Sequence, residues 1–438
     1  MKQSILSKDG VSYVVPFILI TSCFALWGFA NDITNPMVKA FSKIFRMSAT
    51  DGALVQVAFY GGYFAMAFPA AMFIRRYSYK AGVLVGLGLY ALGAFMFYPA
   101  KMTGEYYPFL IAYFILTCGL SFLETSSNPY ILSMGTEETA TRRLNLAQSF
   151  NPMGSLLGMY VAMNFIQAKL NPLDTASRAD LTPAEFEAVK EYDLSVLIGP
   201  YLAIGLVILA MFVLILFWRM PKNGDKNHNI DFVPTLRRIF AMPHYREGVI
   251  AQFFYVGVQI MCWTFIIQYG TRVLMADGMA EQAAEVASQQ YNILAMIIFC
   301  CSRFICTFLL RYVNTGRLLT VLAIVGGLLV VGVIGLQNIY GLYCLVGVSA
   351  CMSLMFPTIY GIALTGLGDD AKFGAAGLII AILGGSVLPP FQAAIIDQVE
   401  LLGMPAVNVS FILPFVCFVV IAIYGHRTFL RSKGQLGG

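Results

Sequence analysis

Two acidic side chains lie inside long apolar stretches, where a charge is unexpected. Asp32 stands within Trp27–Pro36 and Glu124 within Phe122–Pro129, whereas nearly all the other acids lie in polar segments or near the ends of apolar stretches. A carboxylate at bilayer depth is costly unless it faces protein or water, so such residues usually mark a pathway. The alternative is a structural ion pair with Arg303, the one base inside an apolar stretch.

Glu124 is the stronger candidate for a proton carrier. Removal from water favours the neutral form of a carboxylic acid, so a buried glutamic acid can exchange a proton near neutral pH. Histidine does not suit this role here, because His228, His244 and His426 lie in predicted loops or at the ends of predicted spans. We therefore expect Glu124 to carry a coupling proton, assisted by Asp32.

Polar and aromatic side chains recur every three or four residues near both acids and in the second half of the chain. This spacing places side chains on one face of a helix, which predicts a water-filled cavity. Amides that bind hydroxyls, beside aromatic faces that pack on C–H surfaces, are typical of a sugar site. The alternative is ordinary hydrogen bonding between helices. The candidate sugar-binding residues are Trp27, Asn31, Asn35, Tyr60, Gln148, Asn151, Tyr255, Gln259, Trp263, Phe356 and Tyr360.

The composition requires that these residues be held in a membrane. Of the 438 residues, 58% are hydrophobic and 12% are charged, and the mean hydropathy is +0.74. An ordinary soluble chain has about 45–50% apolar and about 25% charged residues. A surface as apolar as this one must face lipid, so the chain is predicted to be an integral membrane protein.

Apolar stretches of about 20 residues, the length that crosses a bilayer, occur twelve times. We therefore predict an all-α membrane protein with a six-helix half at residues 1–218, a linker at 219–245 and a second six-helix half at 246–438. The first six predicted spans are Tyr13–Phe41, Ala53–Ile74, Ala81–Ala100, Tyr107–Met134, Leu144–Ile166 and Leu194–Trp218. The second six are Val249–Met275, Gln289–Tyr312, Leu318–Gln337, Tyr340–Leu367, Phe373–Asp397 and Val407–Leu430.

Charge and internal similarity support this arrangement. Most of the 28 Lys and Arg residues lie at the chain ends and in the even-numbered connections, which predicts that both termini are cytoplasmic and that the polar segment Gln167–Asp193 is external. Basic residues follow both the second and the eighth span, and the fourth and tenth spans carry Pro129 and Pro357 at corresponding places. This similarity favours two duplicated halves, as in many transporters.

Several function classes are disfavoured. No basic run exceeds two residues despite the net charge of +5, so we expect no nucleic-acid partner. The nine cysteines lie in apolar stretches without a CxxC pattern and are expected to pack as small apolar side chains. The sequence has no P-loop, no HExxH and no metal-binding spacing, so we expect neither an enzyme nor a cofactor nor a metal site. An uncoupled channel or a membrane receptor stays open as an alternative.

The segments around Glu124 resemble the fucose permease family of the major facilitator superfamily, and the resemblance extends over most of the chain. The family implies alternating access by two six-helix halves and proton symport of a monosaccharide. It also implies that Glu124, Gln148 and Asn151 belong to the site. The matching segments are Leu123–Tyr130, Arg143–Asn151, Phe59–Phe64, Tyr77–Gly82, Ala251–Gln259 and Phe356–Ile359.

Two positions depart from the family pattern. Fucose permeases carry an Asp at the place of Asn35, whereas this chain carries Asp32, one helical turn away on the same face. The generic superfamily loop after the second span has an Asp where this chain has Arg75, which leaves Arg76 and Lys80 of the pattern. The displaced acid keeps sodium coupling open, together with relatives that carry glucose, galactose or N-acetylglucosamine.

These observations predict a monomeric secondary transporter in a bacterial inner membrane. It imports L-fucose or a related monosaccharide together with protons, so its expected partners are the sugar, the proton and the lipid bilayer. Arg76, Lys80 and Arg303 are the candidate gating residues.

Overall fold

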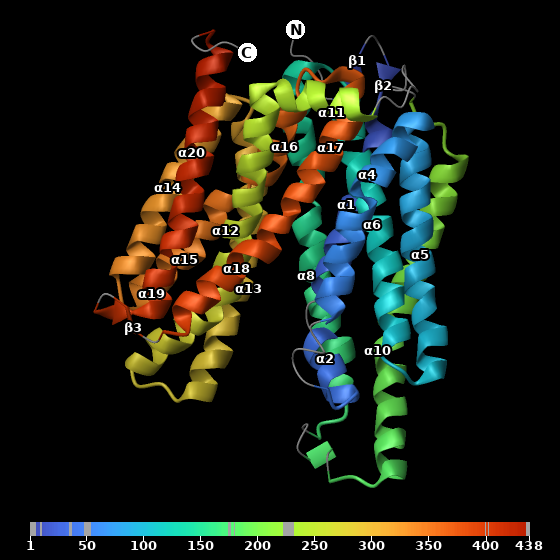
Figure 1. The fold of residues 1–438 in the computed structure, drawn as a ribbon, viewed down its shortest axis with the longest axis vertical. Coiled ribbons are helices and arrows are strands. Elements are labelled where there is room, and N and C mark those ends of the chain that lie inside the picture. The colour runs from blue at the N-terminus through green and yellow to red at the C-terminus, as the bar shows by residue number, and fades with distance from the viewer. Residues whose placement is uncertain are drawn as a thin grey trace. The chain divides into compact units, whose positions relative to one another are not determined.

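The chain forms two compact units. The computed structural model describes residues 6–8, 11–34, 37–47, 54–173, 177–178, 180–221, 232–398, 400–401 and 403–434, and Figure 1 draws its fold. An N-terminal unit comprises Leu6–Met134 and Phe150–Ile230, and a C-terminal unit comprises Gly135–Ser149 and Asp231–Gly438. The short segment Gly135–Ser149 therefore packs with helices that follow it by more than 80 residues. The two units are described separately below.

Long helices build the N-terminal unit, and local sequence signals set their ends. Ser78 precedes a helix and accepts a hydrogen bond from the Ala81 N–H at 3.0 Å, while Thr182 and Glu185 form a reciprocal capping box. The elements are β1 (Ser7–Lys8), β2 (Val11–Ser12), α1 (Val14–Thr34), α2 (Met37–Ile44), α4 (Leu54–Arg76), α5 (Tyr79–Thr103), α6 (Tyr107–Ser133), α8 (Asn151–Val161), the π-helical turn η2 (Ala162–Ile166), the 3-10 turn η3 (Gln167–Lys169) and α10 (Pro183–Phe217).

The C-terminal unit is also helical, and its longest helix, α12, contacts most of the other helices of the unit. Asn314 caps α14 by accepting hydrogen bonds from the N–H groups of Gly316 and Arg317. The elements are η1 (Glu137–Thr139), α7 (Ala140–Gln148), α11 (Phe232–Ala241), α12 (Pro243–Ala276), α13 (Glu281–Leu309), α14 (Thr315–Gly335), α15 (Ile339–Met352), α16 (Met355–Leu364), η4 (Gly368–Asp370), α17 (Ala371–Ile380), η5 (Ala381–Leu383), α18 (Gly384–Ile396), β3 (Glu400–Leu401), β4 (Met404–Pro405), α19 (Ala406–Ser410) and α20 (Ile412–Ser432).

Within the described residues, eleven helices are long and apolar enough to cross a membrane. The predicted span Leu144–Ile166 is the exception, because α7, α8 and η2 divide its length between them. Pro152 stands in the first turn of α8, where its missing N–H is tolerated, so the helix restarts there instead of continuing from α7. The break separates the C-terminal unit, which contains α7, from the N-terminal unit, which contains α8.

Helices α1 and α8 pack backbone against backbone. A Cβ atom at Gly28 would overlap the main chain of Asn151, and a Cβ atom at Gly154 would overlap the main chain of Ala25. Small residues at such contacts allow membrane helices to approach closely. The contact holds the start of α8 beside the middle of α1.

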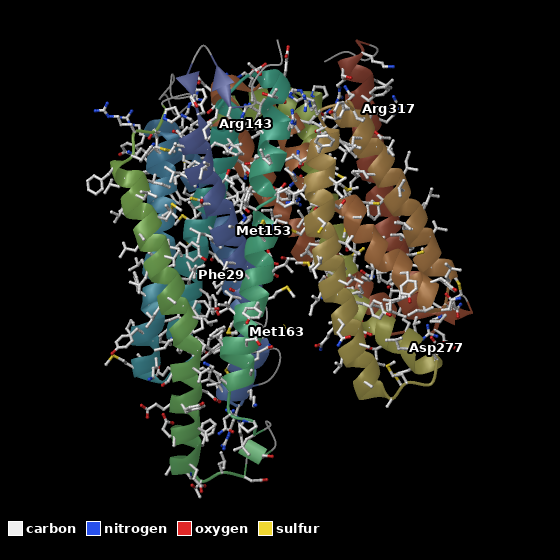
Figure 2. All side chains as sticks on the ribbon, turned by 180° about the vertical axis from the view of Figure 1, so that it is seen from behind. Phe29, Arg143, Met153, Met163, Asp277 and Arg317 are labelled. Atoms are coloured by element: carbon white, nitrogen blue, oxygen red, sulfur yellow. The ribbon has the colours of Figure 1, made fainter. Side chains whose placement is uncertain are left out.

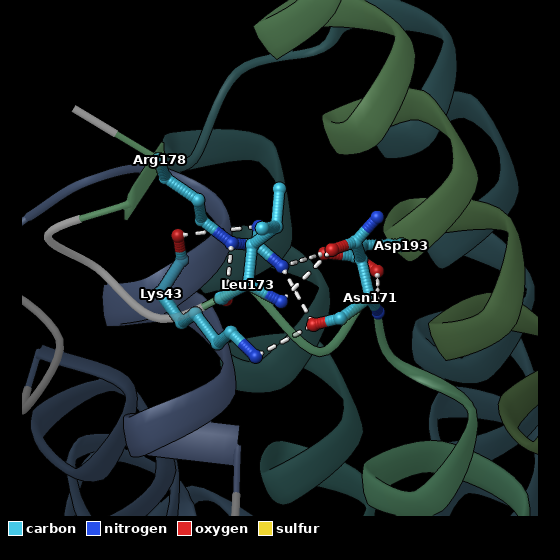
Figure 3. Close-up of polar contacts among 5 residues, drawn as sticks. All are labelled: Lys43, Asn171, Leu173, Arg178 and Asp193. Carbon is cyan, nitrogen blue, oxygen red and sulfur yellow. Dashed lines mark hydrogen bonds and ion pairs between the residues drawn. The ribbon is translucent and has the colours of Figure 1, made fainter. Parts of the chain in front are cut away.

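The connection between η3 and α10 is fastened by a buried ion pair (Figure 3). The Arg178 guanidinium donates to Asp193 at 2.6 Å, and both side chains are fully buried. Arg178 also donates to the carbonyls of Leu173 and Asn171, while the Lys43 ammonium on α2 donates to the Asn171 carbonyl at 2.6 Å. We call these five residues the loop clasp. It fixes the connection to both α2 and α10.

Candidate functional site

Glu124 is a buried acid on α6. Its side chain is 5% exposed, and its Oε2 has no hydrogen-bond partner among the described residues. No described Lys, Arg or His forms an ion pair with it, whereas Asn128 donates to its main-chain carbonyl at 3.0 Å. A carboxylate held this way is costly, and protonation removes that cost. Glu124 is therefore suited to gaining and losing a proton.

Two tyrosines lie between Glu124 and Asp32 in the N-terminal unit. Tyr63 on α4 lies within electrostatic range of both Glu124 and Tyr60, and Tyr60 lies within range of Asp32 on α1. Ser121 on α6 donates to the Tyr63 carbonyl at 3.1 Å and holds α4 beside α6. Asp32 and Tyr60 are half-buried, whereas Tyr63 is buried. Asp32, Tyr60, Tyr63 and Glu124 are thus linked pairwise as electrostatic neighbours, and we call these four residues the polar row.

The other predicted residues of α1 differ in their surroundings. Trp27 is buried, and its ring centroid lies 4.2 Å from that of Phe24. Asn31 is half-buried and forms no hydrogen bond with a described residue, which leaves its amide available to a ligand. Asn35 lies outside the described residues, so its relation to Asp32 is still a prediction.

Asn151 has one structural contact and one available acceptor. Its Nδ2 donates to the Phe24 carbonyl at 3.1 Å, which fastens α8 to α1. Its Oδ1 accepts no hydrogen bond from a described residue, and the side chain is half-buried. The amide oxygen can therefore accept a hydrogen bond from a sugar hydroxyl.

In the C-terminal unit, three predicted residues follow one face of α12. Tyr255 donates to the Met352 carbonyl at 3.1 Å, and the Trp263 indole N–H donates to the Ser349 hydroxyl at 3.1 Å. Gln259 lies between them along the helix and is half-buried. Because both aromatic side chains bind α15, the face is held rigidly beside the end of that helix.

Phe356 and Tyr360 on α16 extend this aromatic surface. Their rings stack with centroids 6.1 Å apart, and the Phe356 ring meets the Tyr255 ring edge-on at 6.1 Å. Phe356 is half-buried and Tyr360 is fully buried. The structure therefore brings Tyr255, Phe356 and Tyr360 together as one cluster.

Arg303 on α13 binds two points where helices are interrupted. Its Nε donates to the carbonyl of Ser353, between α15 and α16, at 2.5 Å, and a terminal nitrogen donates to the carbonyl of Gln148, the last residue of α7, at 3.1 Å. Carbonyls at a helix end lack partners within the helix, and a cation there is favourable. The guanidinium also lies 4.5 Å from the Phe299 ring centroid, and it has no ion pair within the described chain.

The other two gating candidates lie near a helix end of the N-terminal unit. The Lys80 ammonium donates to the carbonyls of Leu216 and Trp218, both at 2.9 Å, and so caps the end of α10. Arg76 is exposed at the end of α4. The hydrogen bonds of Lys80 are those of a residue that caps a helix.

The prediction from sequence did not include Gln252 among the site residues. Gln252 is fully buried on α12, and neither atom of its amide group has a hydrogen-bond partner among the described residues. It precedes Gln259 by seven residues and so lies on the same helix face, two turns away. That spacing was readable in the sequence. Asn145 also escaped the site prediction, and it donates to the Thr358 hydroxyl at 3.1 Å.

Comparison with known proteins gives consistent matches along the chain. Residues 20–403 match the family model of the Major Facilitator Superfamily. An L-fucose-proton symporter of Haemophilus influenzae is 51% identical over 99% of this chain and 100% of its own length. An L-fucose-proton symporter of Escherichia coli is 32% identical over 95% of this chain and 93% of its own. The crystal structure of a Major Facilitator Superfamily transporter, FucP, in the outward conformation matches with a TM-score of 0.85 and 31% identity, over 95% of this chain and 99% of that one.

Proposed function

The chain belongs to the Major Facilitator Superfamily, and from that premise we propose that it is a symporter of L-fucose and protons. It is an all-α, multi-pass membrane transporter, so the predicted fold class and family are confirmed. The observation that carries the coupling proposal is Glu124, a buried acid with no cation and no hydrogen bond at Oε2 among the residues that the structure describes. The two relatives described above are named as proton symporters, and sodium coupling has no support in these comparisons.

Coupling requires that Glu124 bind a proton on one side of the membrane and release it on the other. The protonated carboxyl is neutral and can donate a hydrogen bond, which lowers the cost of its burial while the sugar is bound. The amides of Asn31, Asn151 and Gln259 bind hydroxyls, with Gln148 and Asn35 as further candidates. The aromatic cluster of α12 and α16 packs against the C–H face of the sugar.

The contacts of Arg303 account for its proposed gating role. Arg303 binds the carbonyl of Gln148, and Asn145 binds Thr358, so α7 is fastened to α13 and α16. Only Ser149 and Phe150 connect the end of α7 to the start of α8, which belongs to the N-terminal unit. Arg303 would therefore act on gating by holding the α7 end of the connection that joins the two units. Arg76 remains a gating candidate on sequence grounds, whereas the Lys80 contacts favour a structural role.

Asp32 is expected to do the work of the family's acid from one helical turn away. Asp32→Asn should reduce proton-driven sugar uptake several-fold, because the polar row then ends without a carboxyl. Combining it with Asn35→Asp should restore much of that uptake, since this variant carries a carboxyl at the position where the family carries its acid. Uptake by proteoliposomes under an imposed pH gradient measures both variants. Undiminished uptake by Asp32→Asn would exclude the role.

Gln252 is expected to bind sugar hydroxyls during passage through the C-terminal unit. Gln252→Leu should raise the half-saturating sugar concentration about fivefold, because one neutral hydrogen bond contributes about 1 kcal/mol. Gln289→Leu, at an exposed position of α13, is the control and should leave uptake unchanged. If Gln252 instead binds only a trapped water, the variant will keep its uptake kinetics and gain thermal stability.

We further propose that the protein is a monomer in the bacterial inner membrane. The distribution of Lys and Arg favours an orientation with both termini in the cytoplasm. A cysteine at Glu187, exposed at the start of α10, should react with a membrane-impermeant maleimide on intact cells. A cysteine at Asn227 in the linker should react only after the membrane is opened. The parent chain provides the background from its nine cysteines. The reverse labelling pattern would contradict the orientation.

Competition in proteoliposomes tests the choice of sugar. Unlabelled L-fucose should displace labelled L-fucose at lower concentration than D-glucose, D-galactose or N-acetylglucosamine. A stronger effect of another sugar would replace L-fucose as the substrate and leave the symport mechanism in place.

A further inference from the structure

An apolar groove lies in the N-terminal unit. Its volume is about 650 Å³, and α1, α8 with its π-helical turn η2, η3 and α10 line it. Phe29 of α1 forms its buried floor, and Figure 2 shows Phe29 between the green α10 and the blue-green α8. Phe165 and Val207 stand on its two walls with about half of each side chain exposed. The groove is therefore open along its length.

Small residues on α10 create this space. Gly199 and Ala203 are one helical turn apart and both line the groove. A Cβ atom added at Gly199 would have no heavy atom within 4 Å. On the opposite wall, the π-helical turn of η2 departs from regular α-helical packing, which is often seen at functional positions. A side chain larger than glycine therefore fits at residue 199, and the protein leaves that volume empty of its own atoms.

The polar side chains of the lining lie at one end. Of the eleven lining residues, only Lys169 and Ser195 are polar, and the Ser195 hydroxyl donates to the carbonyl of Glu191. Lys169 is exposed, its ammonium lies 5.2 Å from the Phe165 ring centroid, and it has no ion pair within the described part of the chain. One end of the groove thus offers an available cation, and the remainder offers apolar surface.

The length of the groove matches one leaflet of a bilayer. Ser195 and Val207 line its two ends on α10 and are separated by about 18 Å of helix rise. The hydrocarbon core of a bilayer is about 30 Å thick, so one leaflet contributes about 15 Å. A lysine at the end of a membrane helix places its ammonium at the level of the lipid headgroups. An acyl chain in the groove would therefore bring its headgroup to Lys169.

We propose that this groove binds one anionic phospholipid, with an acyl chain between α8 and α10 and the phosphate on Lys169. The residues that line the groove include none of those assigned above to the sugar and the proton. It differs from general lipid contact because it is concave, is floored by Phe29 and has a cation at one end only.

Two measurements on the purified full-length chain test this site. Native mass spectrometry after addition of phosphatidylglycerol should show one retained lipid, and retention of phosphatidylcholine should be about fivefold weaker. Phosphatidylglycerol with a photoreactive group in its acyl chain should crosslink to residues of the groove, Ala203 and Phe165 among them. Crosslinks spread equally over exposed residues of other helices, such as Leu328 of α14, would overturn the proposal.

Matched variants distinguish the contribution of the apolar groove to lipid binding from that of the Lys169 charge. Gly199→Leu fills the groove and should abolish both lipid retention and crosslinking, while sugar uptake confirms that the variant folds. Gly335→Leu is the control, because a Cβ atom there also meets no atom within 4 Å and the residue ends α14. Lys169→Gln should keep the crosslinks and lose the preference for phosphatidylglycerol. Unchanged retention by Gly199→Leu would contradict the site, whether or not Lys169→Gln has an effect.

Discussion

Replacement of Glu124 by glutamine is expected to abolish accumulation of sugar against a gradient. Glutamine resembles the protonated acid in shape and hydrogen bonding, but it cannot release a proton. A carrier fixed in the protonated form can still exchange labelled for unlabelled sugar across the membrane, because exchange needs no net proton movement. Glu124→Gln should therefore lose uphill uptake and keep exchange when both are measured in the same proteoliposomes.

The matched control is another acid outside the polar row. Glu105 is exposed between α5 and α6, so Glu105→Gln should leave both uphill uptake and exchange unchanged. Accumulation by Glu124→Gln would show that another group carries the proton. If the variant loses both exchange and accumulation, Glu124 acts in sugar binding and not in coupling.

Breaking the loop clasp is expected to produce the largest loss of stability. Arg178→Ala leaves Asp193 buried without its cation, and removal of one partner of a buried ion pair typically costs about 3–5 kcal/mol. The midpoint of thermal unfolding should fall accordingly, and the connection before α10 should become sensitive to protease. Both are measurable on detergent-purified protein.

A surface ion pair serves as the control for the loss of stability in Arg178→Ala. Lys190 pairs with Glu187 at 2.9 Å, and the Glu187 side chain is 62% exposed, so Lys190→Ala should cost less than about 1 kcal/mol. The double variant Arg178→Met with Asp193→Leu should recover much of the stability lost by Arg178→Ala, because no unpaired charge stays buried. Equal destabilisation by Arg178→Ala and Lys190→Ala would contradict the importance of the clasp.

The sequence predicts the membrane spans well because hydrophobic length is a local property. The break between α7 and α8 is harder to predict from the sequence, because the polar residues before Pro152 are compatible with a continuous span. The carbonyl at the end of α7 is bound by Arg303, which lies 155 residues away in the sequence, and such a long-range contact is not visible in the sequence. The pairing of Arg178 with Asp193 was equally hidden, because a polar external connection gives no sign of which charges become buried.

The residues of the candidate site also fall into those that the sequence predicts and those that only the structure identifies. Glu124 was recognisable because a lone acid in an apolar stretch is unusual, and the structure places it in a buried environment. Lys80 matched a family pattern, yet its contacts are those of a helix cap. The unpaired amide of Gln252 became evident only from three-dimensional packing, since a sequence does not show which hydrogen-bond partners are missing.

The central claim is that a proton gradient drives L-fucose uphill through this protein. Proteoliposomes with an alkaline interior and no sodium should accumulate labelled L-fucose above the external concentration. A protonophore should release the accumulated sugar, and added sodium at fixed pH should change nothing. Accumulation that needs sodium and ignores the pH gradient, or uptake that stops at the external concentration, would contradict the claim.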